Sequence, residues 1–291
     1  DYDYAQIAVM ICDGRYNPVD IGRMNLYGWR FAMVFPLALC FKIFGSTSEN
    51  IAALWPLIAS LGTAAVLYRI GAKLFDSKTG LIAAILHLLY PADIHFGTTV
   101  LTETPFNFLI ALSMLFFVIG EDSRRWYVQS LWFLLCGSMT TWLLYGRPYG
   151  IMILAAYGAF MVVRHRIRFN YLFIIAGAAL TLAAIECAVH AHTGTWLENF
   201  KVMKRMIDPM FTPVSNYSQH LDFYRQTLFN NRMHLPHFYI FIMGFGVLFN
   251  WMRFSPSFAS EKLSPEADRR YREHGYLILF WMASILLYIE F

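Results

Sequence analysis

Long apolar runs, separated by short polar segments, make up most of the chain. A membrane-spanning helix needs about 20 predominantly apolar residues, and a helix satisfies its own backbone hydrogen bonds in lipid. The pattern therefore predicts an all-α fold, a polytopic membrane helical bundle. The runs that predict spans are Ile51–Tyr68, Gly80–Ile94, Pro105–Ile119, Trp126–Leu144, Gly150–Val163, Tyr171–His190, Phe238–Met252 and Tyr276–Phe291.

A further apolar run, Trp29–Phe44, is shorter and contains Pro36. It could cross the membrane or lie along its surface. Short loops rich in Lys and Arg stay on the cytoplasmic side, so their positions decide between these alternatives. The basic loop residues are Arg69, Lys73, Lys78, Arg124, Arg125, Arg164, Arg166, Arg168, Arg269, Arg270 and Arg272.

These basic loops alternate with segments nearly free of Lys and Arg, namely Gly45–Asn50, Pro91–Thr104 and Tyr145–Gly150. The alternation holds only if Trp29–Phe44 does not cross, because a crossing there would invert every later loop. We therefore expect Pro36 to interrupt that run and interfacial helices to lie in the first outer loop. The segments poor in Lys and Arg then share the non-cytoplasmic side.

The composition agrees with a membrane protein. Hydrophobic residues make up 58% of the chain and charged residues 14%, against roughly 25% charged residues in soluble domains. The net charge of +4 suits contact with anionic lipid, and we expect no nucleic-acid partner. The four cysteines lack the spacing of a metal site or a disulfide framework. We expect Cys136 and Cys187 to be core residues, and we assign no metal ligands.

The pattern divides the chain into four segments. Residues 1–50 form an outer-face loop, residues 51–190 a transmembrane core, residues 191–236 a second outer-face loop and residues 237–291 further transmembrane helices. The chain begins without Met and stops at Phe291 inside an apolar run. We therefore expect that the sequence is truncated at both ends.

Carboxylates concentrate in the first outer segment. Asp1 and Asp3 lie at the start of Tyr4–Met10, a run that predicts an amphipathic helix at the membrane surface. Partial desolvation at the water–lipid boundary makes a carboxylate more basic. Such a group suits a general base that takes a proton from an acceptor hydroxyl. A solvated acidic loop is the alternative interpretation.

The Pro91–Thr104 turn is a second polar patch on the outer side. Glu103 stands just before a helix that we expect to open at Pro105. A carboxylate there could act on substrate, or it could only be favoured by the helix dipole. His95 could donate a hydrogen bond to a phosphate or be a structural histidine.

Arginines at the membrane edge are candidate phosphate ligands. Arg147 lies between two spans, and Arg30 opens the run Trp29–Phe44. A guanidinium at this depth pairs with an anion or reaches to headgroups, and it binds phosphate in a bidentate manner. Glu186 is an intramembrane carboxylate and hence a further functional candidate. The basic and aromatic residues of Ala191–Pro236 fit a phosphate-and-sugar site or a headgroup-binding lid.

Five sequence elements then follow one another in a specific order. They are an acidic residue before Tyr4-Ala5-Gln6-Ile7-Ala8, an apolar segment from Trp29-Arg30 to Phe44-Gly45-Ser46, Leu67–Phe75, Leu89–Pro91 leading to Thr102–Pro105, and Gly146-Arg147-Pro148. Their order and spacing resemble the dolichyl-phosphate-mannose protein mannosyltransferase and aminoarabinose transferase-like superfamily. The resemblance covers the chain from about Asp1 to Val163.

The resemblance implies a GT-C glycosyltransferase fold. Such an enzyme moves a sugar from a polyprenyl-phosphate donor to a hydroxyl acceptor on the non-cytoplasmic face and inverts the anomeric centre. Carried over residue by residue, Asp1 resembles the catalytic carboxylate of the outer loop, Arg30 the basic residue of the apolar-segment motif and Glu103 the acid of the second loop. Gly146-Arg147-Pro148 resembles the family's Arg-Pro motif. We expect Asp1 or Asp3 to act as the base, and Arg30 and Arg147 to bind the leaving phosphate.

The family resemblance also predicts the partners and the location of the protein. No cofactor is expected besides the lipid-linked sugar, which is the donor substrate. The expected partners are membrane lipid, the polyprenyl-phosphate sugar and other membrane subunits. We expect a multi-pass protein of the bacterial inner membrane.

Two departures from the family pattern motivate an alternative function. The family often carries an Asp-Glu pair where this chain begins, and a His/Lys-Pro-Pro motif where this chain has Gly28-Trp29-Arg30-Phe31. The alternative is a non-catalytic GT-C-like scaffold subunit of a larger membrane complex. A transporter is disfavoured, because the two halves of the chain show no matching pair of spans broken by Gly or Pro.

Overall fold

The computed structural model describes residues 2–16, 30–146, 151–163, 169–194, 196–197 and 201. Every regular element among these residues is a helix, so the all-α prediction is confirmed. The predicted spans Phe238–Met252 and Tyr276–Phe291 lie outside the described residues. The helices are α1 (Tyr2–Cys12), α3 (Phe31–Phe44), α4 (Glu49–Ala52), α5 (Leu54–Leu74), α6 (Ser77–Leu89), α7 (Pro91–Thr98), α8 (Glu103–Asp122), α9 (Trp126–Leu144), α10 (Ile151–Val163) and α11 (Leu172–Thr193), with a 3-10 turn at Phe169–Tyr171.

The chain forms two compact units. The first consists of Asp1–Ile151 and Arg168–Lys204, and the second of Met152–Ile167 and Arg205–Phe291. All the described helices except α10 belong to the first unit.

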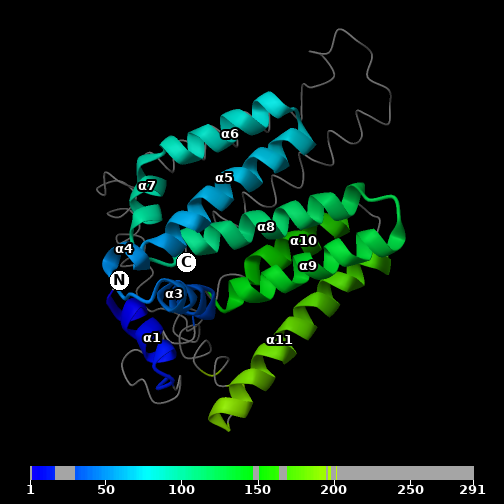
Figure 1. Ribbon diagram of the computed structural model, residues 1–291. Coiled ribbons are helices and arrows are strands. Elements are labelled where there is room, and N and C mark those ends of the chain that lie inside the picture. The colour runs from blue at the N-terminus through cyan, green and yellow to red at the C-terminus, as the bar shows by residue number, and fades with distance from the viewer. Residues whose placement is uncertain are drawn as a thin grey trace, which may run out of the picture. The chain divides into compact units, whose positions relative to one another are not determined.

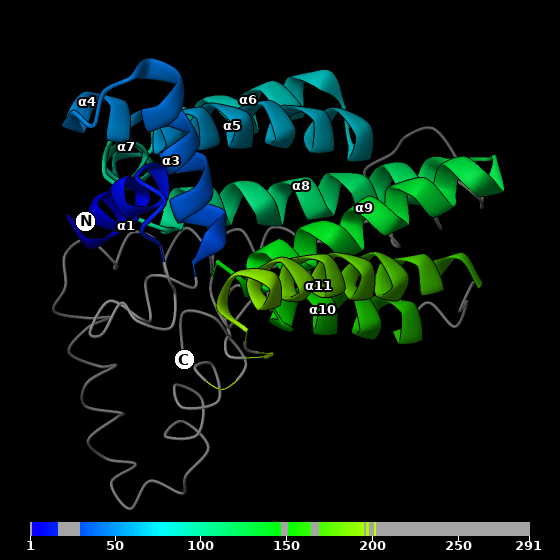
Figure 2. The same cartoon turned by 60° about the horizontal axis from the view of Figure 1, so that its bottom comes forward.

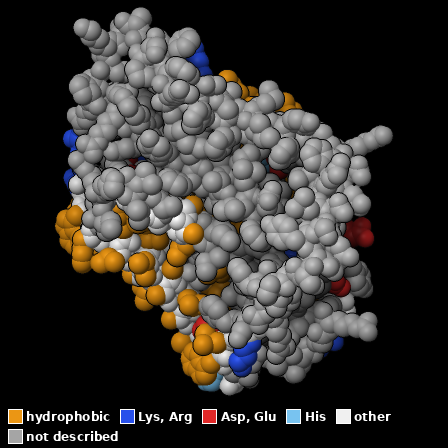
Figure 3. Space-filling view, turned by 180° about the vertical axis from the view of Figure 1, so that it is seen from behind, with side chains coloured by type: hydrophobic (Ala, Val, Ile, Leu, Met, Phe, Trp, Pro, Cys, Tyr) orange, Lys and Arg blue, Asp and Glu red, His pale blue; other side chains and the backbone are white. Residues whose placement is uncertain are grey.

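The protein is an integral membrane protein. Within the described residues, three helical segments are long and apolar enough to cross a bilayer: Glu49–Leu74, Glu103–Asp122 and Phe169–Ala191. Large apolar side chains lie exposed on helix surfaces, as expected where lipid is the solvent. They include Leu81, Ile82, Ile85 and Leu86 of α6 and Leu172, Ile175 and Leu180 of α11. A band of hydrophobic side chains is visible along the described part of the face in Figure 3.

The helices of the bundle pack side by side in the order α6, α5, α8, α9 and α11. α5 contacts α6 and α8, α8 contacts α9, and α9 contacts α11, with their axes roughly aligned (Figure 1, Figure 2). Small residues let α9 and α11 approach closely, a common arrangement between helices in membranes. A Cβ placed on Gly137 would lie 1.9 Å from the Ile174 carbonyl oxygen, and one on Gly177 would lie 2.0 Å from the Leu134 carbonyl oxygen.

The predicted span Gly80–Ile94 is wrong at its C-terminal end. α6 ends at Leu89, and Pro91 begins the separate eight-residue helix α7. Tyr90 has φ −72° and ψ 119°, because a residue before proline is driven out of the helical region. Part of the expected Pro91–Thr104 turn is thus a short helix, which packs against α5, α6 and α8.

Two helices of the first segment lie at one end of the bundle. α3 has 14 residues, a length of roughly 21 Å at 1.5 Å per residue, which is shorter than the hydrocarbon core of about 30 Å. It packs on α1 and lies across the ends of α5, α8 and α9 (Figure 1, Figure 2). The expectation that the run does not cross the membrane stays a prediction.

The expected interruption at Pro36 is not seen. α3 continues through Pro36 as one helix, since a proline removes a single backbone donor and the rest of the helix remains packed. The inner face of α3 forms a buried cluster with Tyr4 and Ile7 of α1. The Tyr4–Met10 run lies within α1, so its predicted helix is confirmed. The members contributed by α3 are Phe31, Met33, Val34, Leu37, Ala38 and Phe41.

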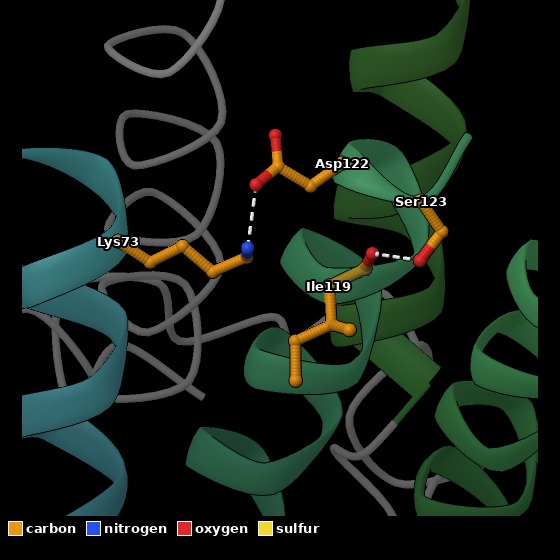
Figure 4. A network of polar contacts seen from close by, with 4 residues as sticks. All are labelled: Lys73, Ile119, Asp122 and Ser123. Carbon is orange, nitrogen blue, oxygen red and sulfur yellow. Dashed lines mark hydrogen bonds and ion pairs between the residues drawn. The ribbon is translucent and has the colours of Figure 1, made fainter.

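The opposite end of the bundle carries polar contacts both within and between helices. Lys73 at the end of α5 pairs with Asp122 at the end of α8, and the Ser123 hydroxyl donates to the Ile119 carbonyl at 2.7 Å (Figure 4). The Tyr171 hydroxyl donates to Glu121 at 2.7 Å. These contacts hold together the helix ends that adjoin the loops with the basic residues.

The cysteine prediction is half correct. All four cysteines are free thiols, and Cys136 is buried as expected, but Cys187 is exposed on α11. A thiol behaves as a small apolar group, so on the surface of a membrane helix it can face lipid and does not need a place in the core.

Candidate functional site

Arg30 joins three segments of the chain at one end of the bundle. It caps the start of α3, and its Nη1 donates to the Tyr4 hydroxyl of α1 and to the Thr102 hydroxyl, 3.4 Å away, just before α8. The guanidinium carbon also lies 5.7 Å from the centroid of the Tyr4 ring, within cation–π range. Tyr4 and Thr102 are both buried. We call Tyr4, Arg30 and Thr102 the Arg30 cluster.

Two of the predicted carboxylates flank this cluster in the chain. Asp3 lies in the first turn of α1, directly before Tyr4, and is half-buried. Glu103 follows Thr102 and is also half-buried. The predicted helix start at Pro105 is wrong by two residues, because α8 begins at Glu103 itself. A carboxylate in the first turn is stabilised by the helix dipole, which explains why the helix starts there.

His95 lies apart from the Arg30 cluster. It is exposed on α7, with its ring centroid 5.6 Å from that of Phe96. Its backbone carbonyl accepts hydrogen bonds from the Thr98 and Thr99 hydroxyls. The structure gives the His95 side chain no hydrogen bond or ion pair within the described part of the chain.

Asp1 and Arg147 lie outside the described residues, but the residues before Arg147 are described. Tyr145 stacks on Phe31, with ring centroids 5.3 Å apart and planes 9° apart. A Cβ on Gly146 would lie 3.5 Å from the Phe106 ring, one turn into α8. The Gly146-Arg147-Pro148 motif therefore begins at the same end of the bundle as Arg30 and Glu103.

An apolar cavity of about 770 Å³ opens beside these residues. Phe31, the neighbour of Arg30 in the chain, forms part of its wall. The remaining lining comes from the end of α1, from α3, α9 and α11. These residues are Ile11, Gly14, Tyr16, Phe35, Trp142, Leu180, Thr181, Ala184, Ile185, Ala188 and Val189.

Tyr16 is a polar residue in this lining. It is buried, and its ring packs edge-on against Phe35, with centroids 6.2 Å apart. Burial raises the pKa of the Tyr16 phenol far above its ordinary value, so the side chain stays neutral. The wall around Tyr16 thus adds no charge to the cavity.

Two polar pairs at this end were not predicted. The Tyr145 hydroxyl donates to Glu186 Oε1 at 2.6 Å, which supplies the partner that sequence reasoning could not name for Glu186. His87 Nδ1 lies 3.0 Å from Asp93 Oδ2 across the α6–α7 junction. The Pro91 break between His87 and Asp93 is the sequence signal that could have indicated this second pair.

The arrangement fits one kind of ligand. Arg30 directly precedes Phe31 of the cavity wall, and a cation next to an apolar cavity would suit an amphiphile with an anionic head and a long apolar tail. Carboxylates near the same edge can accept protons or hydrogen bonds from a polar group attached to that head. Among the described residues, no cluster of three or more His, Cys, Asp or Glu side chains has the arrangement of a metal site.

The comparisons with known proteins agree with this geometry. The sequence profile described as dolichyl-phosphate-mannose-protein mannosyltransferase matches residues 31–190, more than half of the chain. The match includes Glu103 and Arg147 and begins directly after Arg30. No curated protein and no solved structure is significantly similar to the chain. The chain therefore belongs to the dolichyl-phosphate-mannose-protein mannosyltransferase family, and this membership implies a membrane glycosyltransferase with a polyprenyl-phosphate sugar as donor.

Proposed function

We propose that the chain transfers the donor sugar to a hydroxyl acceptor at the end of the bundle that carries the Arg30 cluster. This end would face the non-cytoplasmic side, and the transfer would invert the anomeric centre. The observation that carries the proposal is the position of Arg30. It is held by α1 and the start of α8, one residue from the wall of an apolar cavity.

The donor would bind through its two unlike parts. The prenyl chain would enter the apolar cavity, where burial of hydrocarbon from water or interface is favourable. The phosphate would remain at the rim, with Arg30 and Arg147 as its cations. A guanidinium suits this role because it binds phosphate oxygens in a bidentate manner.

The reaction would be a single displacement. The acceptor oxygen forms a bond to the anomeric carbon while the bond from that carbon to the phosphate oxygen breaks. The leaving polyprenyl phosphate keeps the electron pair, and fixed cations stabilise the negative charge that grows on it. Attack from the side opposite the leaving group inverts the configuration.

A carboxylate would accept the proton of the acceptor hydroxyl. Asp1 is the first candidate and Asp3 the second, and the half-buried position of Asp3 beside Tyr4 supports a place for α1 at the site. Glu103 would orient the sugar or the acceptor from the first turn of α8. General-base catalysis of this kind contributes typically 10²–10⁴-fold to a rate.

The distribution of charge supports the proposed sidedness. Lys73, Arg124 and Arg125 lie at the end of the bundle opposite the Arg30 cluster, since α5 and α8 run from one end to the other. Positive residues in short loops favour the cytoplasmic side. The site would then face outward, and a bacterial inner membrane is the location that we propose.

Arginine substitutions test the proposal directly. We expect Arg30→Ala to lower kcat/KM for sugar transfer from a polyprenyl-phosphate donor by about 100-fold, the order expected for loss of a charge-assisted contact to phosphate. Arg30→Lys should restore part of the loss. The matched control is Arg15→Ala, because Arg15 pairs with Asp13 on the exposed surface after α1.

Carboxylate substitutions complete the test. Glu103→Gln should lower transfer, whereas the same change at the exposed Glu49 should not. If Arg30→Ala and Glu103→Gln both transferred sugar at the wild-type rate, this site would have no part in the reaction. A wild-type protein that transfers no sugar, yet co-purifies in fixed ratio with other membrane subunits, would favour the scaffold function instead.

A further inference from the structure

A buried carboxylate lies within the wall region of the cavity. Glu186 of α11 is only 3% exposed, and its neighbours Ile185 and Val189 line the cavity. A carboxyl group in the membrane is costly unless its oxygens find donors. Oε1 accepts from the Tyr145 hydroxyl at 2.6 Å, and Oε2 accepts from the Leu197 backbone N–H at 2.8 Å.

The first of these bonds fixes an aromatic ring at the site. Tyr145 is 2% exposed and ends α9, and its ring stacks on Phe31, which is also 2% exposed. Phe31 is part of the cavity wall and adjoins Arg30. Tyr145 also stands two residues before Arg147. One hydroxyl bond therefore connects Glu186 with the aromatic wall next to both candidate phosphate ligands.

The second bond holds the start of the segment after α11. Leu197 has φ +57°, a left-handed conformation that a leucine seldom adopts without outside support. Its N–H points at Glu186 Oε2, so the carboxylate supplies part of that support. The same side chain thus joins the end of α9, the body of α11 and the segment that follows it.

We propose that Glu186 is a positioning residue for the donor site. It orients Tyr145, and through the Tyr145–Phe31 stack it sets the wall against which the first part of the prenyl chain and its phosphate lie. Glu186 does not touch the reacting atoms. This inference rests on the proposed function, because it names a residue that shapes the same donor site.

Two single variants and their combination test the coupling. Glu186→Ala removes both hydrogen bonds, and Tyr145→Phe removes one while keeping the ring that stacks on Phe31. We expect each to raise KM for a polyprenyl-phosphate sugar by about tenfold and to change kcat by less than about threefold, the pattern of lost donor binding. The double variant should be no worse than the worse single variant, since Glu186→Ala already removes the bond that Tyr145→Phe removes.

The matched control breaks a different bond between the same helices. The Thr141 hydroxyl of α9 donates to the Ala178 carbonyl of α11 at 3.0 Å, and neither residue lines the cavity. Thr141→Val should lower the thermal stability in detergent without changing KM. Glu186→Gln should keep KM within about threefold of wild type. Its amide oxygen can accept from Leu197 and its NH₂ can donate to Tyr145.

The outcomes separate positioning from simple stability. Equal KM changes in Glu186→Ala and Thr141→Val, or additive effects of Glu186→Ala and Tyr145→Phe, would overturn the inference. Affinity for polyprenyl phosphate without sugar gives a readout that does not need activity. If the wild type bound that lipid but transferred no sugar, the proposed function would fail, and the variants' affinities would still decide the role of Glu186.

Discussion

The side chains of Tyr4 and Arg30 are in contact although 26 residues separate them in the chain. The phenol oxygen accepts a hydrogen bond from the guanidinium, and the ring faces its charged carbon at 5.7 Å. The contact fixes the first turn of α1, which carries Asp3, against the start of α3. One candidate phosphate ligand therefore contacts the residue that directly follows a candidate base.

The first prediction concerns this contact. Tyr4→Phe removes the phenol oxygen and keeps the aromatic face. A hydrogen bond to a charged group contributes about 1.5–3 kcal/mol, so kcat/KM for sugar transfer should fall by about 10- to 100-fold. Tyr127→Phe is the matched control, because Arg125 donates to the Tyr127 hydroxyl at 3.0 Å on the exposed opposite end. Equal effects of the two substitutions would show that the Tyr4 bond has no special role.

The second prediction concerns His87, which links three helices. Its Nδ1 lies 3.0 Å from Asp93 Oδ2 of α7, and its Nε2 lies 3.3 Å from the Ser60 carbonyl oxygen of α5. Burial and the Asp93 carboxylate raise the pKa of the nearby Tyr90 phenol, which therefore stays neutral. Asp93→Ala should destabilise the docking of α7 by about 1–2 kcal/mol, because a partly buried partner is lost.

Hydrogen exchange measures that docking. The amides of α7 should exchange faster in Asp93→Ala, while those of α8 and α9 should keep their protection. The exposed His95→Gln serves as the control on the same helix. Unchanged α7 protection in Asp93→Ala would mean that the close approach of Gly97 to Ser60, and not the His87 pair, holds the helix in place.

Much of the bundle could be predicted because its signal is local. A long apolar run predicts a helix whatever surrounds it, and the expected segments Pro105–Ile119 and Trp126–Leu144 lie within α8 and α9. The breaks were harder to predict. Pro91 ends one helix and starts another, whereas α3 continues through Pro36. The same residue type has opposite effects because packing around it decides whether a lost backbone bond is tolerated.

The site depended on contacts between distant parts of the chain. The sequence indicated Arg30 and Glu103 as separate candidates. The hydrogen bond from Arg30 to Thr102, the residue before Glu103, forms because α3 lies across the end of α8. Glu186 could be flagged as an intramembrane carboxylate. Its partner Tyr145 is 41 residues away and is set by how α9 and α11 pack. A pattern read along one chain does not contain that packing.

The third prediction concerns the contact between α9 and α11. Gly137→Leu would place side-chain atoms where the Ile174 carbonyl now lies 1.9 Å from a Cβ position. The helices must separate, so we expect the free energy of unfolding to fall by about 3 kcal/mol or more, at the upper end for overpacking. Reversible unfolding in mixed micelles measures this free energy. Gly158→Ala is the control, because a Cβ there meets nothing within 4 Å.

The fourth prediction concerns the Lys73–Asp122 pair at the opposite end (Figure 4). The side chains are 31% and 52% exposed, and exposed pairs contribute about 0–1 kcal/mol. Lys73→Ala and Asp122→Ala should each lower the unfolding free energy by no more than that, with a smaller effect in high salt. A loss of several kcal/mol in either variant would show that the pair is a principal support of the α5–α8 packing.

The fifth prediction concerns the pH dependence of the start of α6. The Thr79 backbone N–H donates to the Asp76 carboxylate at 2.7 Å and lowers the pKa of Asp76 below its ordinary value of 3.8. A folded-state pKa below the unfolded one means that the contribution to stability is complete above the unfolded value. This contribution is lost as the pH falls through the folded-state pKa.

Hydrogen exchange measures this effect. Protection of the α6 amides should decrease as the pH falls below the ordinary Asp76 pKa of 3.8. Asp76→Ser keeps a capping oxygen that does not titrate, and it should remove the pH dependence. A variant that lost protection over the same pH range as the wild type would assign the effect to another carboxylate.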